Sequence, residues 1–319
     1  MASISDVYTL PLDDWIEAVI KDWLVPNFRP AFRLVQWPVD QVLNGTEAAL
    51  LATPFPLFLL AAGIVAWWLA GRGVALFTVI SLAFLDLLGI WPETMTTLAM
   101  VLTAVVFCAV VGIPVGILAA RSDRFAAGIR PILDIMQTTP AFVYLVPVVM
   151  LFGVGMVPGI IATIVFALPP LIRLTNLGIR QVRGDLVEAG FAFGATPRQV
   201  LWEIQMPLAM RTVMAGLNQT LMLSLSMVVI AALIGAEGLG LIVFRGIGRL
   251  DVGLAALGGI GIVLLAIMLD RITQALGDPA ARLQAAERRR ALGARFRWRR
   301  TESAAPTASE QPPQPRGLG

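Results

Sequence analysis

Long apolar runs, separated by short polar stretches, dominate the sequence from about residue 50 to residue 275. A helix needs about 20 mostly apolar residues to cross the hydrocarbon core of a bilayer. We therefore predict an all-α membrane protein, a polytopic helical bundle of about seven transmembrane helices. The predicted spans cover residues 50–70, 73–91, 95–120, 134–154, 157–175, 212–235 and 252–273.

A short glycine-rich stretch, GVGMVPG, separates the fourth predicted span from the fifth. Glycine and proline favour a turn, and the stretch is too short to hold a domain. We expect the chain to re-enter the membrane directly after it.

The composition supports this reading and removes several kinds of chemistry. Hydrophobic residues make up 57% of the chain and charged residues 14%, against about 25% charged residues in an average soluble domain. Histidine is absent, which excludes imidazole metal sites and histidine acid–base catalysis. The single cysteine, Cys108, lies in an apolar run and is expected to be a core residue. We expect no cleavable signal peptide, because the first residues lack a basic stretch followed by an apolar one.

The basic residues predict the orientation in the membrane. Positive charge is retained on the cytoplasmic side. When the polar segment 176–210 is placed inside, most of the 24 basic residues also lie inside. The N-terminus is then external and the C-terminus cytoplasmic. The basic residues left outside are Lys21, Arg29, Arg33, Arg245 and Arg249.

The two ends of the chain differ from its apolar middle. Residues 1–47 are expected to form an external segment that contains an amphipathic helix, which would lie in the outer membrane interface or pack on the protein itself. Residues 277–319 are rich in arginine and then in proline and serine, as expected of a disordered cytoplasmic tail. Its arginines would anchor the topology or attract anionic lipid. The apolar face of the N-terminal helix would hold Trp15, Ile16, Val19, Ile20 and Trp23.

A polar stretch, EAGFAFGATPRQVLWEIQMP, lies at 188–207 between two apolar runs. A helix over 185–193 would end at Gly194, which can adopt a left-handed conformation. Thr196 and Gln199 have the spacing of a capping box around Pro197, and this predicts a second helix that Pro207 would end. We expect two short amphipathic helices held at a fixed angle.

This stretch resembles the coupling-loop signature of ATP-binding-cassette importer permeases. The usual pattern is EAA, three residues, G, nine residues, I, one residue and LP, and the spacing is kept here with two mild replacements, Gly190 and Met206. The resemblance implies that this loop docks into a cleft on a partner ATPase. The residues expected to couple the chain to the ATPase are Glu188, Ala189, Gly190, Gly194, Ile204 and Pro207.

Three further stretches resemble the glycine betaine, proline betaine and choline branch of these permeases, at 136–158, 224–240 and 249–274. The resemblance implies a type I permease core of five helices at 93–276, preceded by two additional spans at 48–92. It implies a homodimer in the bacterial inner membrane that works with an ATPase and an external binding protein. The lipid bilayer is its other partner, and no nucleic acid is expected.

The chain cannot carry a nucleotide-binding P-loop. That motif needs Gly-Lys-Ser/Thr, and the one lysine, Lys21, lies in the sequence VIKDW. The resemblance therefore implies a transport subunit with no cofactor and no enzymatic activity of its own, whose partner binds ATP and magnesium. We expect no metal site.

Polar residues within the predicted spans suggest a path for a solute, although helix–helix packing explains them equally well. One cluster begins the fourth span and the other lies in the sixth. Tight recognition is expected to belong to the binding protein, since a pathway must release what it admits. The path candidates are Gln137, Thr138, Thr139 and Tyr144 in the first cluster and Asn218, Ser224, Ser226 and Met227 in the second.

Two alternative functions are compatible with the same sequence. The first is an importer of the same class for another small solute, such as an amino acid, a sulfonate or a metal complex. The second is an ATP-independent channel or a proton-coupled transporter, which usually needs ionisable groups inside the membrane. Asp86, Asp134 and Asp270 are the candidates for such groups, and interfacial solvation or pairing accounts for them more simply.

Overall fold

The computed structural model describes residues 18, 19, 22 and 25–277, and every regular element in this part of the chain is helical. The predicted tail at 277–319, apart from Gly277, and most of the predicted N-terminal amphipathic helix lie outside the described residues. The elements are α2 (Val25–Ala52), α3 (Phe55–Ala70), α4 (Arg72–Leu87), α5 (Trp91–Arg121), α6 (Asp123–Thr138), η3 (Ala141–Tyr144), α7 (Leu145–Phe152), α8 (Met156–Arg180), α9 (Gly184–Ala192), α10 (Pro197–Gln199), the π-helical turn η4 (Val200–Gln205), α11 (Met206–Ala231), η5 (Ala232–Ile234), α12 (Leu239–Gly248) and α13 (Val252–Gly277).

The predicted class, an all-α polytopic bundle, is confirmed. Four uninterrupted helical stretches in the described part of the chain are long and apolar enough to cross a membrane. The number rises to six when each of two sharply bent helix pairs is counted as one span. The four stretches are Trp91–Arg121, Met156–Arg180, Pro197–Ile234 and Val252–Gly277, and they match the predictions at 95–120, 157–175, 212–235 and 252–273.

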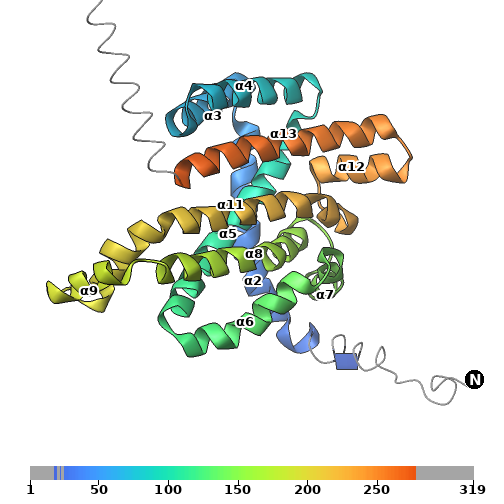
Figure 1. Cartoon of the computed structure of the whole chain (residues 1–319). Helices are drawn as coiled ribbons and strands as arrows, with labels where there is room; N and C mark the ends of the chain where they lie inside the picture. Colours follow the sequence, from blue (N-terminus) through green and yellow to red (C-terminus); the bar gives the residue numbers. More distant parts are fainter. Residues whose placement is uncertain (1–17, 20–21, 23–24, 278–319) are drawn as a thin grey trace, which may run out of the picture. The chain divides into compact units, whose positions relative to one another are not determined.

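The first two predicted spans are shorter than expected. Helices α3 and α4 have 16 residues each, which corresponds to about 24 Å, less than the roughly 30 Å thickness of a hydrocarbon core. They form a hairpin about Gly71 and pack beside α13 (Figure 1). The chain bends by 109° between α2 and α3, and Pro54 is the N-cap residue of α3.

The fourth predicted span, 134–154, is broken near its start, after Thr138. Helix α6 ends at Thr138, and the chain turns by 107° before it continues through η3 and α7. The physical cause is Pro140, because a proline pushes the residue before it out of the helical region. Thr139 accordingly has an extended backbone, with ψ at 129°.

Two helices were not predicted from the sequence. Helix α2 begins well before the first predicted span, and its Val39 and Leu43 are buried against α5 and α8. The ten-residue helix α12 follows Gly238 and packs along α13.

The core of the bundle lies around α8, which packs between α5 and α11 (Figure 1). Small residues let these backbones approach closely, as is usual between membrane helices. A Cβ atom on Gly178 of α8 would lie 2.9 Å from Cβ of Thr212 on α11. Further along the same contact, the Thr220 hydroxyl donates to the Ala167 carbonyl at 3.0 Å. Helix α8 connects the α7–α8 turn at one end of the bundle to α9 at the other end.

The predicted tight turn between the fourth and fifth spans is confirmed. Only three residues separate α7 from α8, and two of them, Gly153 and Gly155, have φ of 86° and 127°. The backbone N–H of Gly155 donates to the Ile234 carbonyl at 2.8 Å. This bond fixes the turn against the end of η5.

Candidate functional site

The polar stretch at 188–207 folds as two helical pieces joined by a rigid turn. Helix α9 ends at Ala192, and Gly194 adopts the left-handed conformation with φ of 84°. The next helix begins with the predicted capping box. The Gln199 N–H donates to the Thr196 hydroxyl at 3.3 Å, and the Thr196 N–H donates to the Gln199 side chain at 2.8 Å. These bonds fix where the second helix starts.

The second helix does not end at Pro207, and that prediction was wrong. Helix α10 continues through the π-helical turn η4 directly into α11, so the stretch from Pro197 to Ile234 is one span. A proline in a helix lacks the N–H donor and crowds the carbonyl four residues earlier. Pro207 instead occupies the second position of α11, immediately after the wider π-helical turn. The loop is therefore connected stiffly to a membrane-spanning helix.

Gly190 brings α9 onto this second helix. A Cβ atom at this position would lie 2.6 Å from Cδ1 of Ile204 and 3.4 Å from Cγ2 of Val200. Gly190 is buried, whereas its neighbours Glu188 and Ala189 are exposed. Glycine at the second alanine position of the usual motif thus has a packing function.

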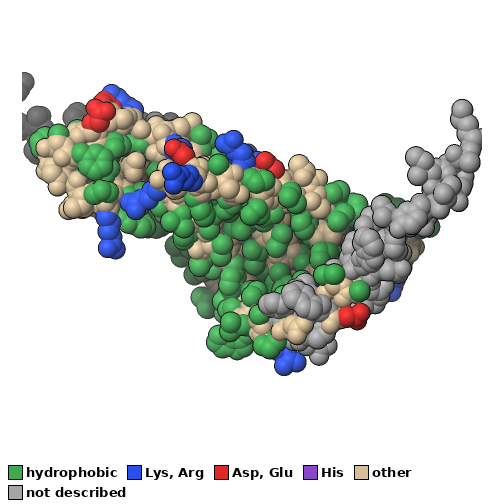
Figure 2. Space-filling model, turned by 90° about the horizontal axis from the view of Figure 1, so that it is seen from below, with side chains coloured by type: hydrophobic (Ala, Val, Ile, Leu, Met, Phe, Trp, Pro, Cys, Tyr) green, Lys and Arg blue, Asp and Glu red, His purple; other side chains and the backbone are tan. Residues whose placement is uncertain are grey.

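The outer surface of the loop carries exposed apolar side chains. Phe193 is 93% exposed and Trp202 is 54% exposed, although both are large and hydrophobic. Contiguous exposed apolar surface marks protein–protein contacts, so these two side chains are candidates for such a contact. Figure 2 shows charged side chains gathered toward the end that carries α9, while the rest of that face is mostly hydrophobic.

Contacts with α5 hold the loop against the bundle. The Arg121 guanidinium, at the end of α5, donates to the Pro197 carbonyl at 3.1 Å. Arg180, at the end of α8, donates to the Ala119 carbonyl at 2.8 Å and pairs with Asp123 at 2.6 Å. The loop and the ends of both helices therefore form one connected unit.

The hydroxyl groups of the first predicted path cluster bind the end of α6. The Thr139 hydroxyl donates to the Ile135 carbonyl at 2.8 Å, and the Tyr144 hydroxyl donates to the carbonyls of Ile135 and Met136. The Thr138 hydroxyl makes a longer bond of 3.4 Å to the same Ile135 carbonyl. The Ile135 carbonyl also accepts from the Thr139 N–H at 3.1 Å. The Met136 carbonyl has no such donor because Pro140 lacks an N–H, and the Tyr144 hydroxyl supplies one. Gln137 is exposed beside them.

The second predicted path cluster is spread over different sides of α11. The Ser224 hydroxyl is buried and donates to the Thr220 carbonyl, whereas Ser226 is exposed. Met227 is buried in the cluster that includes Leu145 of α7. The two predicted clusters therefore approach each other through Met227 and the segment after Tyr144.

Asn218 belongs to a polar network between α11 and α13. Its amide donates to Asp270 at 2.7 Å and accepts from the Thr273 hydroxyl at 2.6 Å. Gln274 donates to the same Asp270 carboxylate at 2.7 Å. Of the other two candidate ionisable groups, Asp134 pairs with Arg173 at 2.6 Å and Asp86 is exposed.

A cavity of about 540 Å³ between α6 and α8 was not predicted. Arg130, Arg173 and Arg180 line it, together with Asp123 and Asp134. The sequence signal for this cavity is the amphipathic pattern of α6. The predictions placed its residues in a loop after 120 and in the fourth span, 134–154. No group of three potential metal ligands occurs among the described residues.

Comparison with known proteins identifies the family. Residues 112–280 match the model of the binding-protein-dependent transport system inner membrane component. The chain is 59% identical over 268 residues to the glycine betaine/proline betaine transport system permease protein ProW of Escherichia coli K12, covering 84% of this chain and 75% of ProW. It is 46% identical over 265 residues to the glycine betaine transport system permease protein OpuAB of Bacillus subtilis 168, covering 83% of this chain and 94% of OpuAB.

A solved structure shares the fold. An inward-facing structure of the MetNI methionine ABC transporter superposes with a TM-score of 0.53 at 24% identity, over 61% of this chain and 95% of that one. This likeness concerns the fold alone. The resemblance drawn from the motif at 188–207 is confirmed, and the chain belongs to the family of binding-protein-dependent transport system inner membrane components.

Proposed function

We propose that this chain is the membrane subunit of an ATP-driven importer for glycine betaine, proline betaine or a closely related quaternary ammonium solute. Support comes from the similarity to ProW, a glycine betaine/proline betaine permease, and to OpuAB, a glycine betaine permease. The single structural observation that carries the proposal is the rigid polar loop, in which α9 is packed through Gly190 onto a helix continuous with α11.

The proposed partner at this loop is an ATPase subunit that binds ATP and magnesium. Its cleft would receive Phe193 and Trp202, because binding there would remove their exposed apolar surface from water. Movement of the loop would then pass along α11 without an intervening hinge. Glu188, Ala189, Gly190, Gly194, Ile204 and Pro207 are proposed to act in this mechanical coupling and in no catalytic step.

The remaining partners follow from the same proposal. An external binding protein would deliver the solute to the end of the bundle opposite α9, and a second copy of the chain would complete the path. The loop would face the cytoplasm, with the N-terminus outside and the C-terminus inside. The path would pass near the two polar clusters, which comprise Gln137, Thr138, Thr139, Tyr144, Asn218, Ser224, Ser226 and Met227.

The solute class can be tested in proteoliposomes that contain the full chain, its ATPase and its binding protein. ATP-dependent uptake of radiolabelled glycine betaine, inhibited by excess unlabelled proline betaine, is the expected result. Uptake of an amino acid or a sulfonate, with no uptake of any betaine, would overturn the proposed solute class.

A further inference from the structure

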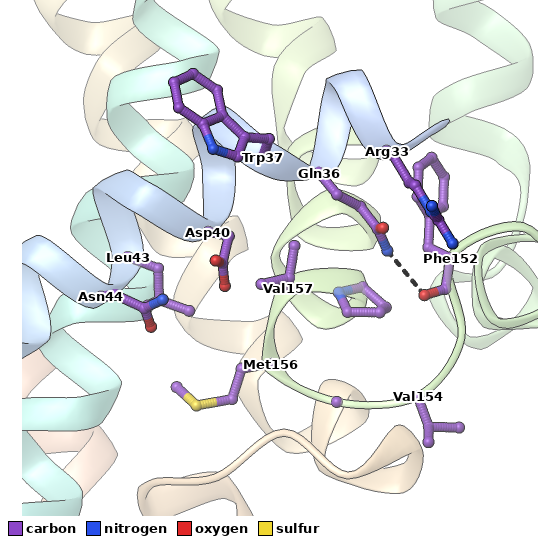
Figure 3. A pocket seen from close by; sticks show the side chains of 12 residues that line it. Arg33, Gln36, Trp37, Asp40, Leu43, Asn44, Phe152, Val154, Met156 and Val157 are labelled. Carbon is purple, nitrogen blue, oxygen red and sulfur yellow. Dashed lines mark hydrogen bonds between the residues drawn. The ribbon is translucent and has the colours of Figure 1, made fainter. Parts of the chain in front are cut away.

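A second cavity, of about 500 Å³, lies between α2 and the α7–α8 turn (Figure 3), at the end of the bundle away from α9 (Figure 1). Its volume lies within the roughly 300–1,000 Å³ range of small-molecule sites. Buried Leu43 and Pro158 belong to its wall. None of the residues assigned to the coupling loop or to the proposed path lines it.

One face of α2 supplies the polar groups of this cavity. Arg33, Gln36 and Asp40 follow each other at intervals of three and four residues, which places them on one side of a helix. Figure 3 shows all three directed toward the α7–α8 turn, whereas the indole of Trp37 points away from it. The Gln36 amide donates to the Phe152 carbonyl at 2.8 Å, which fixes the distance between the two walls.

Two opposite charges, Arg33 and Asp40, line the cavity and form no ion pair with each other. Arg33 and Asp40 are seven residues apart, or about 10 Å along the helix axis. Within the described part of the chain, neither side chain forms an ion pair or a hydrogen bond. A charged group that lines a cavity without a partner can interact with a charged ligand.

Different side chains surround Asp40 and Arg33. Met156, Val157 and the amide of Asn44 line the side of the cavity that holds Asp40, whereas Arg33 is drawn beside the Gln36 amide (Figure 3). A quaternary ammonium group donates no hydrogen bond, so a carboxylate beside apolar side chains can hold it through charge attraction and van der Waals contact. A carboxylate instead needs donors, and a guanidinium supplies several.

We propose that this cavity binds a zwitterionic quaternary ammonium solute, with its ammonium group at Asp40 and its carboxylate at Arg33. The inference rests on the proposed function, under which this end of the bundle faces the delivering binding protein. Arg33 is exposed and Asp40 is half-buried, which suits weak, transient binding of a solute that has just been delivered.

Two ligands separate the contributions of the two charges. Glycine betaine carries both an ammonium and a carboxylate, whereas choline carries only the ammonium. The full chain, assembled with its ATPase in lipid nanodiscs without binding protein, would be titrated with each ligand and followed by saturation-transfer NMR of the methyl protons. Asp40→Asn should weaken both ligands about three- to fivefold, as expected for loss of a partly exposed ion pair.

Arg33→Gln should weaken glycine betaine by a similar factor and leave choline unchanged. Asp86→Asn and Arg245→Gln are matched controls, because both residues are exposed and lie outside the cavity wall, and both variants should bind as the unmodified chain does. No saturable binding to the unmodified chain, or equal binding by all variants, would overturn the site.

Docking of the binding protein provides the remaining comparison. If Asp40→Asn and Arg33→Gln weakened docking of the binding protein but left both titrations unchanged, this surface would be a protein interface and the solute site would be refuted. ATP-driven betaine uptake by the unmodified complex tests the proposed function separately. Normal uptake with a negative titration would overturn the cavity assignment alone.

Discussion

Gly190 of α9 and Ile204 of the π-helical turn are packed so closely that a Cβ atom on residue 190 would lie 2.6 Å from Cδ1 of Ile204. The contact joins the two halves of the loop that we propose couples the chain to an ATPase. It would let these halves, fourteen residues apart in the sequence, move as one body.

Enlarging residue 190 should separate the two halves. Gly190→Val should destabilise the loop by about 1–3 kcal/mol, the usual cost of overpacking, whereas Gly190→Ala should cost less because the end of the Ile204 side chain can rotate. ATPase stimulation by the purified complex measures the effect. Gly184→Ala, where no atom lies within 4 Å of the added Cβ, is the control. Full stimulation with Gly190→Val would contradict the packing argument.

Gly194 is required for its backbone conformation rather than for space. Its φ is 84°, and no atom lies within 4 Å of an added Cβ. Gly194→Val should therefore cost about 1–2 kcal/mol or more, whereas Gly194→Asn should be better tolerated because asparagine visits this region. Thermal unfolding of the two variants in detergent checks the difference. Equal stability would show that the turn is not constrained.

The exposed aromatic residues should matter for partner binding and not for stability. Phe193→Ser and Trp202→Ser remove apolar surface that is exposed in the free chain, so the free energy of unfolding should change by no more than about 0.5 kcal/mol. Co-purification of the ATPase should fall at least about tenfold, as at a protein hot spot. Val252→Ser, 81% exposed at the other end of the bundle, should leave co-purification unchanged. Retained ATPase binding by both loop variants would place the interface elsewhere.

The network around Asp270 separates an ATP-driven importer from a proton-coupled one. Asp270→Asn keeps hydrogen-bonding capacity toward Asn218 and Gln274, so uptake should continue. Asn218→Ala should cost about 1 kcal/mol of stability through loss of interhelical bonds. Uptake is to be measured with and without a pH gradient. Loss of all uptake in Asp270→Asn, with normal folding, would favour proton coupling.

The limits of Trp91–Arg121, Met156–Arg180 and Val252–Gly277 lie close to the predicted ones, because long apolar runs define these spans. This holds even for α8, which contains Pro169 and Pro170. Two other prolines produced errors in opposite directions. Pro140 breaks a predicted span because the preceding residue becomes extended, whereas Pro207 interrupts nothing because it lies in the first turn of α11, just after a π-helical turn.

The site was predicted in part for similar physical reasons. The capping box of Thr196 and Gln199 depends on local spacing, so the sequence predicted it correctly. The partners of Asn218 and Tyr144 depend on tertiary contacts or on the break before Pro140, and the sequence did not indicate them. Helix α2 was missed because its apolar positions are interrupted by the polar residues that line the outer cavity.

The central claim is that a rigid loop receives force from a separate ATPase and passes it along α11. Uptake of betaine should be measured in proteoliposomes that contain this chain and binding protein, with the ATPase present or omitted. The account predicts uptake only with both ATPase and ATP, and its loss in Gly190→Val. Normal uptake by the chain without any ATPase would contradict it.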